Sequence, residues 1–231
     1  MPKLTAHLLD LAPDAFKRAT EHPFLKQAGT AALPRPILLA WLTQDRLYAL
    51  NYIPFMGNLL SKCNIPTSAD RTSTLSWRIA DELIGALINV RREIAMFEDI
   101  LRTEFNWKDG GEEMRVQTKA YSDLFAGAGA QNASLLEGMV VLWATEKCYF
   151  EAWKYARSHI ETGKGEGDVL TKTLIPNWTN EEFEQFVVNL ENLLDELAKE
   201  VQPGPAEMKK SELAWRQILW AEENFWPDVE V

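Results

Sequence analysis

Apolar residues recur every three or four positions along most of this chain, which is the periodicity of a helix with one buried face. Segment 132–161 shows the pattern most fully. Its apolar stripe comprises Met139, Leu142, Trp143, Glu146, Tyr149, Phe150 and Trp153. Runs with the alternation of a β-strand are absent. The sequence therefore predicts an all-α, single-domain multi-helix bundle over residues 1–231, with about seven or eight helices.

Prolines, glycines and capping residues set the expected helix boundaries. After a weaker amphipathic stretch at 4–11, helices are expected over 13–21, 36–61, 67–105, 112–130, 132–161, 179–201 and 205–225. Pro54 is expected to kink or divide the second of these helices. Segment 22–36 contains one glycine and two prolines after Pro23, so it is expected to be mainly a connection.

Composition excludes several classes of protein. The formal net charge is −10 and the pI about 4.9, which argues against binding to nucleic acid or to an anionic membrane surface. No stretch reads as a secretory signal or a membrane span. Cys63 and Cys148 are too few for a disulfide framework. A cytoplasmic protein without a cofactor is the expectation.

Acidic residues interrupt the apolar stripes of several predicted helices. Asp45 shares its stripe with Trp41, Tyr48 and Tyr52, and Glu146 lies in the middle of the stripe of 132–161. Glu222 repeats the pattern in the last helix, and Glu93 is a fourth candidate. Each acid alone is explained by an ion pair or a tyrosine hydroxyl, and Glu222 and Glu93 could lie at the edge of the core. Acids on aromatic faces of three helices favour instead a ligand site for a flat, nitrogen-rich ring.

A metal site is a weaker interpretation of the same acids. The three histidines, His7, His22 and His159, form no Glu-x-x-His pair of the kind that di-iron bundles use. The glycine-rich segment 162–168 lacks the spacing of a phosphate-binding loop and follows no strand. No metal is therefore expected.

Several short motifs occur in an order that resembles one known family. They are "HPF", "AGT" and "ILLAWLTQDRLYAL" near the N-terminus, then "KAYSDLF", "LWATEKCYFEAW" and "EENFW", and together they span nearly the whole chain. The sequence resembles the TenA/thiaminase II family, whose haem-oxygenase-like helical bundle binds an aminopyrimidine. The resemblance also implies a homo-oligomer, a dimer or a tetramer.

The resemblance assigns expected roles to individual residues. Asp45 is expected to bind the amino group and ring nitrogen of the pyrimidine, and Tyr48 to help hold the reacting group. Tyr121 is expected to contact the ring. Glu222 is expected to give and take a proton at the ring, with Phe225 as a pocket wall.

One departure from the family pattern changes the expected chemistry. Members with a catalytic cysteine carry "PCxxxY", whereas this chain reads "ATEKCYF", and Cys148 is interpreted as a packing residue. The chain is instead similar to the branch that uses a glutamate, for which Glu146 is the candidate, with Tyr149 and Tyr52 as further binding residues. A carboxylate is better suited to activating water than to attacking the ring.

The resemblance thus implies a hydrolase of C–N bonds in thiamin salvage. It would remove ammonia or a formyl group from 4-amino-5-aminomethyl-2-methylpyrimidine or its N-formyl derivative. Three alternatives stay open. They are a pyrimidine-binding protein without turnover, a thiaminase II that cleaves thiamin, and a purely structural helical protein.

Overall fold

A computed structural model describes residues 3–108, 111–161, 163, 165 and 167–230, and every regular element within them is a helix. The helices are α1 (Leu4–Leu11), α2 (Pro13–Thr20), α3 (Pro23–Gly29), α4 (Arg35–Ser61), α5 (Leu75–Phe105), α6 (Val116–Gly129), α7 (Leu135–Ser158), α8 (Ile175–Asn177), α9 (Glu181–Val201) and α10 (Pro205–Phe225). A 3-10 turn (Arg71–Ser73) precedes α5, and a π-helical turn (Leu170–Leu174) precedes α8. The predicted all-α class is confirmed.

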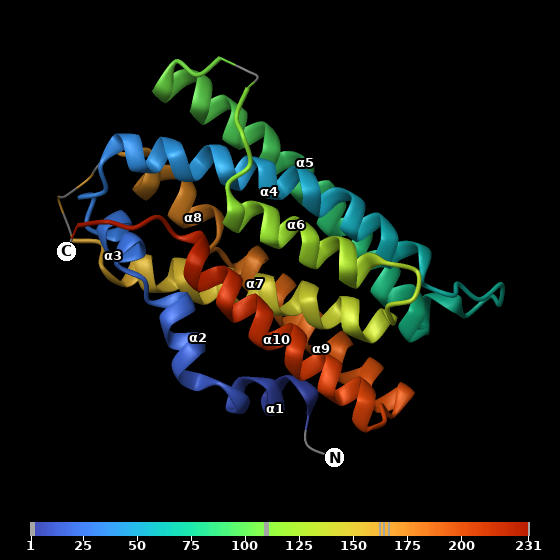
Figure 1. Cartoon of the computed structure of the whole chain (residues 1–231). Helices are drawn as coiled ribbons and strands as arrows, with labels where there is room; N and C mark the ends of the chain where they lie inside the picture. Colours follow the sequence, from blue (N-terminus) through green and yellow to red (C-terminus); the bar gives the residue numbers. More distant parts are fainter. Residues whose placement is uncertain (1–2, 109–110, 162, 164, 166, 231) are drawn as a thin grey trace.

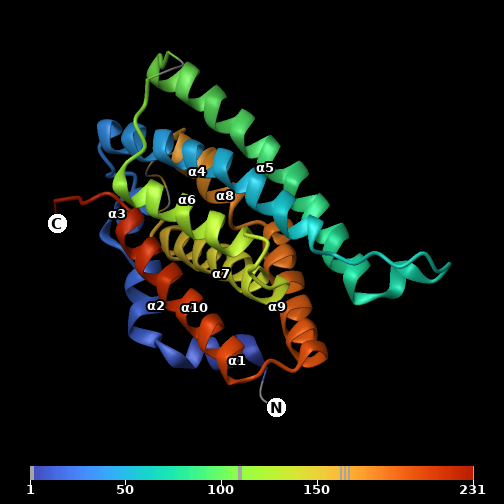
Figure 2. The same cartoon turned by 45° about the vertical axis from the view of Figure 1, so that its right-hand side comes forward.

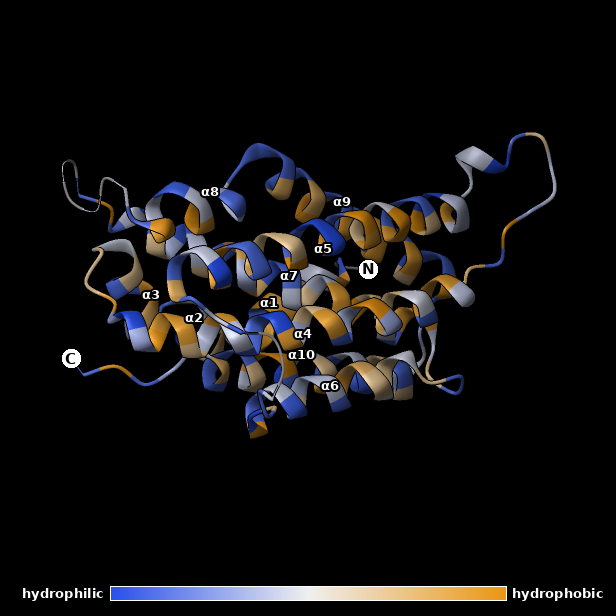
Figure 3. Ribbon diagram, turned by 90° about the horizontal axis from the view of Figure 1, so that it is seen from above, coloured by the Kyte–Doolittle hydropathy of each residue, from blue (hydrophilic) through white to orange (hydrophobic). Residues whose placement is uncertain are grey.

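The long helices lie side by side in a bundle, with α7 in its interior and α4, α6, α9 and α10 around it (Figures 1 and 2). Helix α5 packs on α4 and α9, and the short helices α1 to α3 cover one side of α7, α9 and α10. The segment between α4 and α5 projects beyond the end of the bundle in both views. Hydrophobic residues recur along the long helices with hydrophilic ones between them (Figure 3), as the periodicity predicts.

Several expectations about the helices need correction. The helices expected over 67–105 and 112–130 begin later, at Leu75 and Val116. Segment 22–36 is not mainly a connection, because Pro23–Gly29 forms α3. The His22 ring accepts a hydrogen bond from the Phe24 backbone N–H, and Pro23 suits the first turn. Pro54 does not divide α4, which is continuous to Ser61. Pro54 lies on an exposed part of the helix, where water can satisfy the carbonyl that loses its partner.

Helix α3 approaches α7 so closely that only glycine fits at the contact. A Cβ atom on Gly29 would lie 2.0 Å from the backbone oxygen of Ala156, in α7. A backbone atom cannot rotate away as a side chain can, so the two helices would have to separate. This contact fixes α3 against the C-terminal turn of α7.

Replacing Gly29 with alanine is therefore expected to destabilise the protein by about 2 kcal/mol, the usual cost of overpacking. Urea denaturation at neutral pH measures this change. Gly57→Ala is the matched control, because a Cβ on Gly57, which is also helical, meets no atom within 4 Å. The control is expected to be neutral or stabilising by up to about 1 kcal/mol. Equal stability of the two variants would contradict the close contact.

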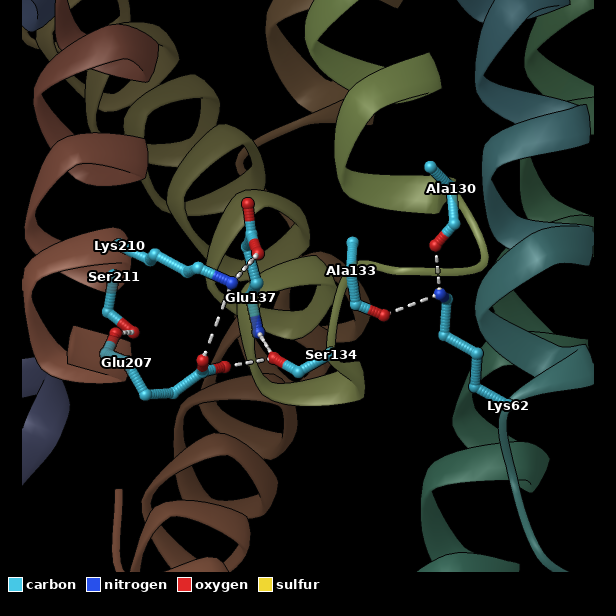
Figure 4. Close-up of polar contacts among 8 residues, drawn as sticks. All are labelled: Lys62, Ala130, Ala133, Ser134, Glu137, Glu207, Lys210 and Ser211. Carbon is cyan, nitrogen blue, oxygen red and sulfur yellow. Dashed lines mark hydrogen bonds and ion pairs between the residues drawn. The ribbon is translucent and has the colours of Figure 1, made fainter. Parts of the chain in front are cut away.

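Polar contacts fasten the turn between α6 and α7 to neighbouring helices (Figure 4). The Lys62 ammonium group, just beyond α4, donates to the backbone oxygens of Ala130 and Ala133. Ser134 caps α7 and donates from its hydroxyl to Glu207, near the start of α10. These contacts hold three helices of the bundle, α4, α7 and α10, in register at one end.

Candidate active site

Asp45 lies inside the bundle, not in solvent. Only 2% of its surface is accessible, and the Tyr149 hydroxyl, on α7, donates to its Oδ2 over 2.8 Å. The four-residue step that places Asp45 on the apolar stripe of α4 also turns it toward α7. The interruption of the stripe therefore corresponds to a contact between two helices.

The other two predicted acids follow the same rule. The Tyr52 hydroxyl, on α4, donates to Glu146 on α7, and the Tyr121 hydroxyl, on α6, donates to Glu222 on α10 over 2.5 Å. Each of the three carboxyl groups thus meets a tyrosine from a neighbouring helix. Of the two partners expected for a single buried acid, an ion-pair partner or a tyrosine hydroxyl, each of these acids has the tyrosine hydroxyl.

Tyr48 lies between the tyrosine–carboxyl pairs. Its ring centroid is 5.0 Å from that of Tyr121, 5.9 Å from that of Tyr52 and 5.9 Å from that of Phe225. Asp45, Glu146 and Glu222 all act electrostatically on its hydroxyl. Tyr48 therefore connects the Asp45–Glu146 side of the site with the Glu222 side.

A small cavity opens beside these groups. Five of the predicted residues line it, namely Asp45, Tyr48, Tyr52, Glu146 and Tyr149. Its volume is about 30 Å³, room for about two water molecules. Tyr48, Glu146 and Tyr149 keep some accessible surface although they are enclosed, because they face this cavity.

Three predicted residues lie behind Tyr48 and do not line the cavity. They are Tyr121, Glu222 and Phe225. Glu222 is only 2% accessible, so it is not at the edge of the core. Phe225 lines instead an outer depression, with Trp41 and Trp226, beside the ends of α4 and α10. Only part of the predicted set therefore reaches the cavity directly.

Further residues line the cavity beside the predicted set. Glu93, on α5, lines it, which agrees with its place as a fourth candidate acid and not with a position at the edge of the core. Trp178 and Phe183, beside the N-terminus of α9, complete the wall, and no motif pointed to them. Their place follows from the packing of α5 against α9, which local periodicity does not encode.

Burial raises the pKa of each acid in the tyrosine–carboxyl pairs. The pKa values of Asp45, Glu146 and Glu222 rise to about 8, first because these groups are removed from water. The tyrosine hydrogen bonds partly offset the rise, and the neighbouring carboxylates add to it. Such carboxyl groups can donate or accept a proton close to neutral pH.

Cys148 is buried in the core and does not line the cavity. Burial raises the pKa of its thiol well above the ordinary value, and the nearby carboxylate of Glu222 raises it further. A thiol in this environment is poorly ionised, and the thiolate is the nucleophilic form. The Cys63 thiol, half-buried after α4, has a pKa raised to about 11 by burial.

The described residues contain no group of three or more His, Cys, Asp or Glu side chains that could hold a metal ion. Within the same part of the chain, no helix has both the length and the apolar character needed to cross a bilayer.

Comparisons with known proteins place this site in context. Residues 12–230 match the TENA/THI-4/PQQC family. A Fusarium pseudograminearum protein named "Probable transcription factor" is 30% identical over 99% of this chain, and the chain spans about half (52%) of that protein. A Glycine max protein named "Probable bifunctional TENA-E protein" is 24% identical over 91% of this chain and 86% of its own length.

Solved structures agree with the fold. A TenA homologue from Pyrococcus furiosus superposes with a TM-score of 0.81 at 22% identity, over 96% of this chain and 98% of the other. A TenA family protein from Silicibacter gives a TM-score of 0.80 at 16% identity, over 97% and 95%. The haem-oxygenase-like all-α fold expected from the resemblance is thereby confirmed. Because the family match covers nearly every residue, the chain belongs to the TENA/THI-4/PQQC family.

Proposed function

We propose that this protein is an aminopyrimidine hydrolase of thiamin salvage. Its substrates would be 4-amino-5-aminomethyl-2-methylpyrimidine and the N-formyl derivative. Water would release formate from the formyl compound, and would displace ammonia from the amine to give the hydroxymethylpyrimidine. The observation that supports this function best is the group of three tyrosine-bound carboxyls, from α4, α7 and α10, around Tyr48.

The proposed roles follow from the positions of these groups. Asp45 would bind the 4-amino group and a ring nitrogen, because a protonated carboxyl can accept a hydrogen bond from the amino group at one oxygen and donate its O–H to the ring nitrogen. Glu146, on the cavity wall beside Tyr48, would hold and deprotonate water. Glu222 would pass a proton to the ring or to the leaving amine. A base and an acid with pKa values close to the working pH suit this division.

Substrate binding would require local rearrangement. The cavity of about 30 Å³ is smaller than a substituted pyrimidine. The Tyr149 hydroxyl already donates a hydrogen bond to Asp45, and the Tyr52 hydroxyl already donates one to Glu146. We therefore infer that the ligand takes the place of these hydroxyls, so that each buried carboxyl exchanges one hydrogen-bond partner for another and none is left unpaired.

Hydrolysis without thiamin cleavage is the expected result when the protein is incubated separately with the amine, its N-formyl derivative and thiamin. Mass spectrometry would follow hydroxymethylpyrimidine, loss of formyl and release of the thiazole. The state of Cys148 supports this expectation, because cleavage of thiamin through a thiolate needs an ionised and accessible sulfur. Thermal-shift measurements with the same compounds would report binding independently of turnover.

A matched pair of variants shows whether the activity arises at this site. Glu146→Gln is expected to lose product formation. Glu151→Gln, one and a half turns further along α7, is expected to retain it, because Glu151 is paired with Lys147 and Lys154 away from the cavity. A thermal shift without product from any compound would indicate a binding protein. If neither a thermal shift nor product is observed, the three acids have only structural roles.

A further inference from the structure

Glu93 is the one cavity carboxyl that the proposed reaction does not use. It lies on α5, and it acts electrostatically on both Asp45 and Glu146. Its Oε1 accepts hydrogen bonds from Asn177 Nδ2 over 2.9 Å and from Trp178 Nε1 over 2.8 Å. These partners come from the α8 segment, across the cavity wall from α4 and α7.

The partners of Glu93 differ in kind from those of the other three acids. An indole N–H and an amide NH₂ group can only donate, so they favour a charged carboxylate at Glu93. A tyrosine hydroxyl can also accept, so it is compatible with a protonated carboxyl at Asp45, Glu146 or Glu222. Burial raises the pKa of Glu93, and the hydrogen bonds from Asn177 and Trp178 partly offset that rise. Glu93 is therefore the cavity carboxyl whose hydrogen-bond partners favour the charged form.

That charge has no cation beside it in the cavity. The described lining residues include no Lys, Arg or His side chain. Arg92, the preceding residue, is exposed, and its guanidinium donates to the side chain of Asn89 over 2.6 Å. Arg92 lines an outer groove between α5 and α9, not the cavity. Arg92 therefore attracts the Glu93 carboxylate only from outside the cavity. On the cavity side the carboxylate has no cation, which makes a favourable place for a positively charged ligand group.

Glu93 also lies at the end of the cavity nearest to the surface. The outer groove has a volume of about 360 Å³, and Asn177, a partner of Glu93, lines it. Phe183 lines both the groove and the cavity. A substituent of a pyrimidine ring held at Asp45 could reach Glu93, because both carboxyls line the same small cavity.

We infer that Glu93 is a specificity-determining residue that binds the ammonium form of a primary amine carried by the substrate. The inference rests on the proposed function, and it selects the cationic aminomethylpyrimidine over its neutral N-formyl derivative as the ligand that fits this site. The ammonium group would donate a charge-assisted hydrogen bond to the Glu93 carboxylate. A formamide or hydroxymethyl group at the same position brings no charge.

Isothermal titration with three pyrimidines tests this inference. The ligands are the aminomethyl, N-formylaminomethyl and hydroxymethyl compounds, which share one ring. In the wild-type protein the aminomethyl compound is expected to bind about 10-fold or more tightly than the hydroxymethyl compound. Glu93→Gln is expected to remove that preference, while the affinity for the two neutral compounds changes less than about 2-fold.

Glu82→Gln is the matched control. Glu82 lies three helical turns before Glu93 on α5, and it lines the outer groove and not the cavity. Its replacement is therefore expected to leave the preference for the aminomethyl compound unchanged. Equal weakening of all three ligands by Glu93→Gln would overturn the inference, and so would a wild-type protein that binds the neutral compounds equally well. If Glu93→Gln does not fold, the wild-type comparison decides alone.

The two proposals fail separately. Charge-selective binding without any product would retain the inference about Glu93 and contradict the hydrolase. Product formation without a preference for the amine would support the hydrolase and contradict the inference about Glu93.

Discussion

Replacing Glu222 with glutamine is expected to lower kcat for the proposed hydrolysis by roughly 10²- to 10⁴-fold, the usual contribution of a positioned acid or base. Glutamine has the shape of a protonated glutamate, so the Tyr121 hydroxyl can still donate to its side-chain oxygen. It cannot give or take the proton that the reaction needs. At pH 5, where the raised pKa keeps Glu222 protonated in the folded protein, the thermal transition is expected to stay within about 3 °C of the wild-type value. Steady-state kinetics and calorimetry on the same preparation measure both quantities.

Glu223→Gln is the control for this substitution. Glu223 occupies the next position on α10, but its carboxylate pairs with Arg18 near the surface at 2.7 Å. Loss of such a pair costs about 0–1 kcal/mol, and no change in kcat is expected. Turnover by Glu222→Gln at the wild-type rate would remove Glu222 from the proposed mechanism. A large fall in thermal stability would show that its role is structural.

The sequence predicts the bundle well because its strongest signal is local. Helical periodicity depends only on neighbours three and four residues apart, so it identifies the long helices, and Pro205 and Pro227 mark the limits of α10. The seven-residue helix α3 escapes this signal because it is too short to show a repeat. Its position depends on Gly29, whose lack of a side chain matters only because α7 lies against it.

The candidate site shows where local reasoning ends. Asp45, Glu146 and Glu222 are recognisable because an acid on an apolar stripe is conspicuous within a single helix. The family resemblance indicates Tyr52, Tyr121 and Tyr149 only as residues that bind the ligand. The pairing of each tyrosine with an acid depends on which helices are adjacent. Glu93 has the weakest signal of the four acids, because it lies in the polar run "RREI". The packing of α5 against α9 turns it into part of the cavity.

Trp178 and Phe183, unlike the acids, are not conspicuous in the sequence. Aromatic residues at helix ends are common in any bundle core, so neither residue carries a distinct signal. Trp178 acquires a function-related place only because its indole N–H reaches Glu93, 85 residues away in the sequence. Contacts across such a separation follow from tertiary structure alone.

The free energy of unfolding is expected to fall as the pH rises from 5 to 8, which is the opposite of the behaviour of a protein with salt-bridged acids. Asp45, Glu146 and Glu222 have ordinary pKa values of 3.8, 4.5 and 4.5, and the fold raises each to about 8. Between these values the folded state binds more protons than the unfolded state. The stability that the neutral carboxyls provide is complete below pH 4 and is lost as the pH rises through 8.

Each such proton changes the free energy of unfolding by about 1.4 kcal/mol per pH unit. Glu222→Gln removes one titrating group, so its curve of stability against pH is expected to be flatter than the wild-type curve by about that slope between pH 5 and 8. Urea denaturation at three pH values provides the measurement. Parallel curves for wild type and Glu222→Gln would mean that Glu222 is charged inside the folded protein, which would remove the proton donor that the proposed reaction requires.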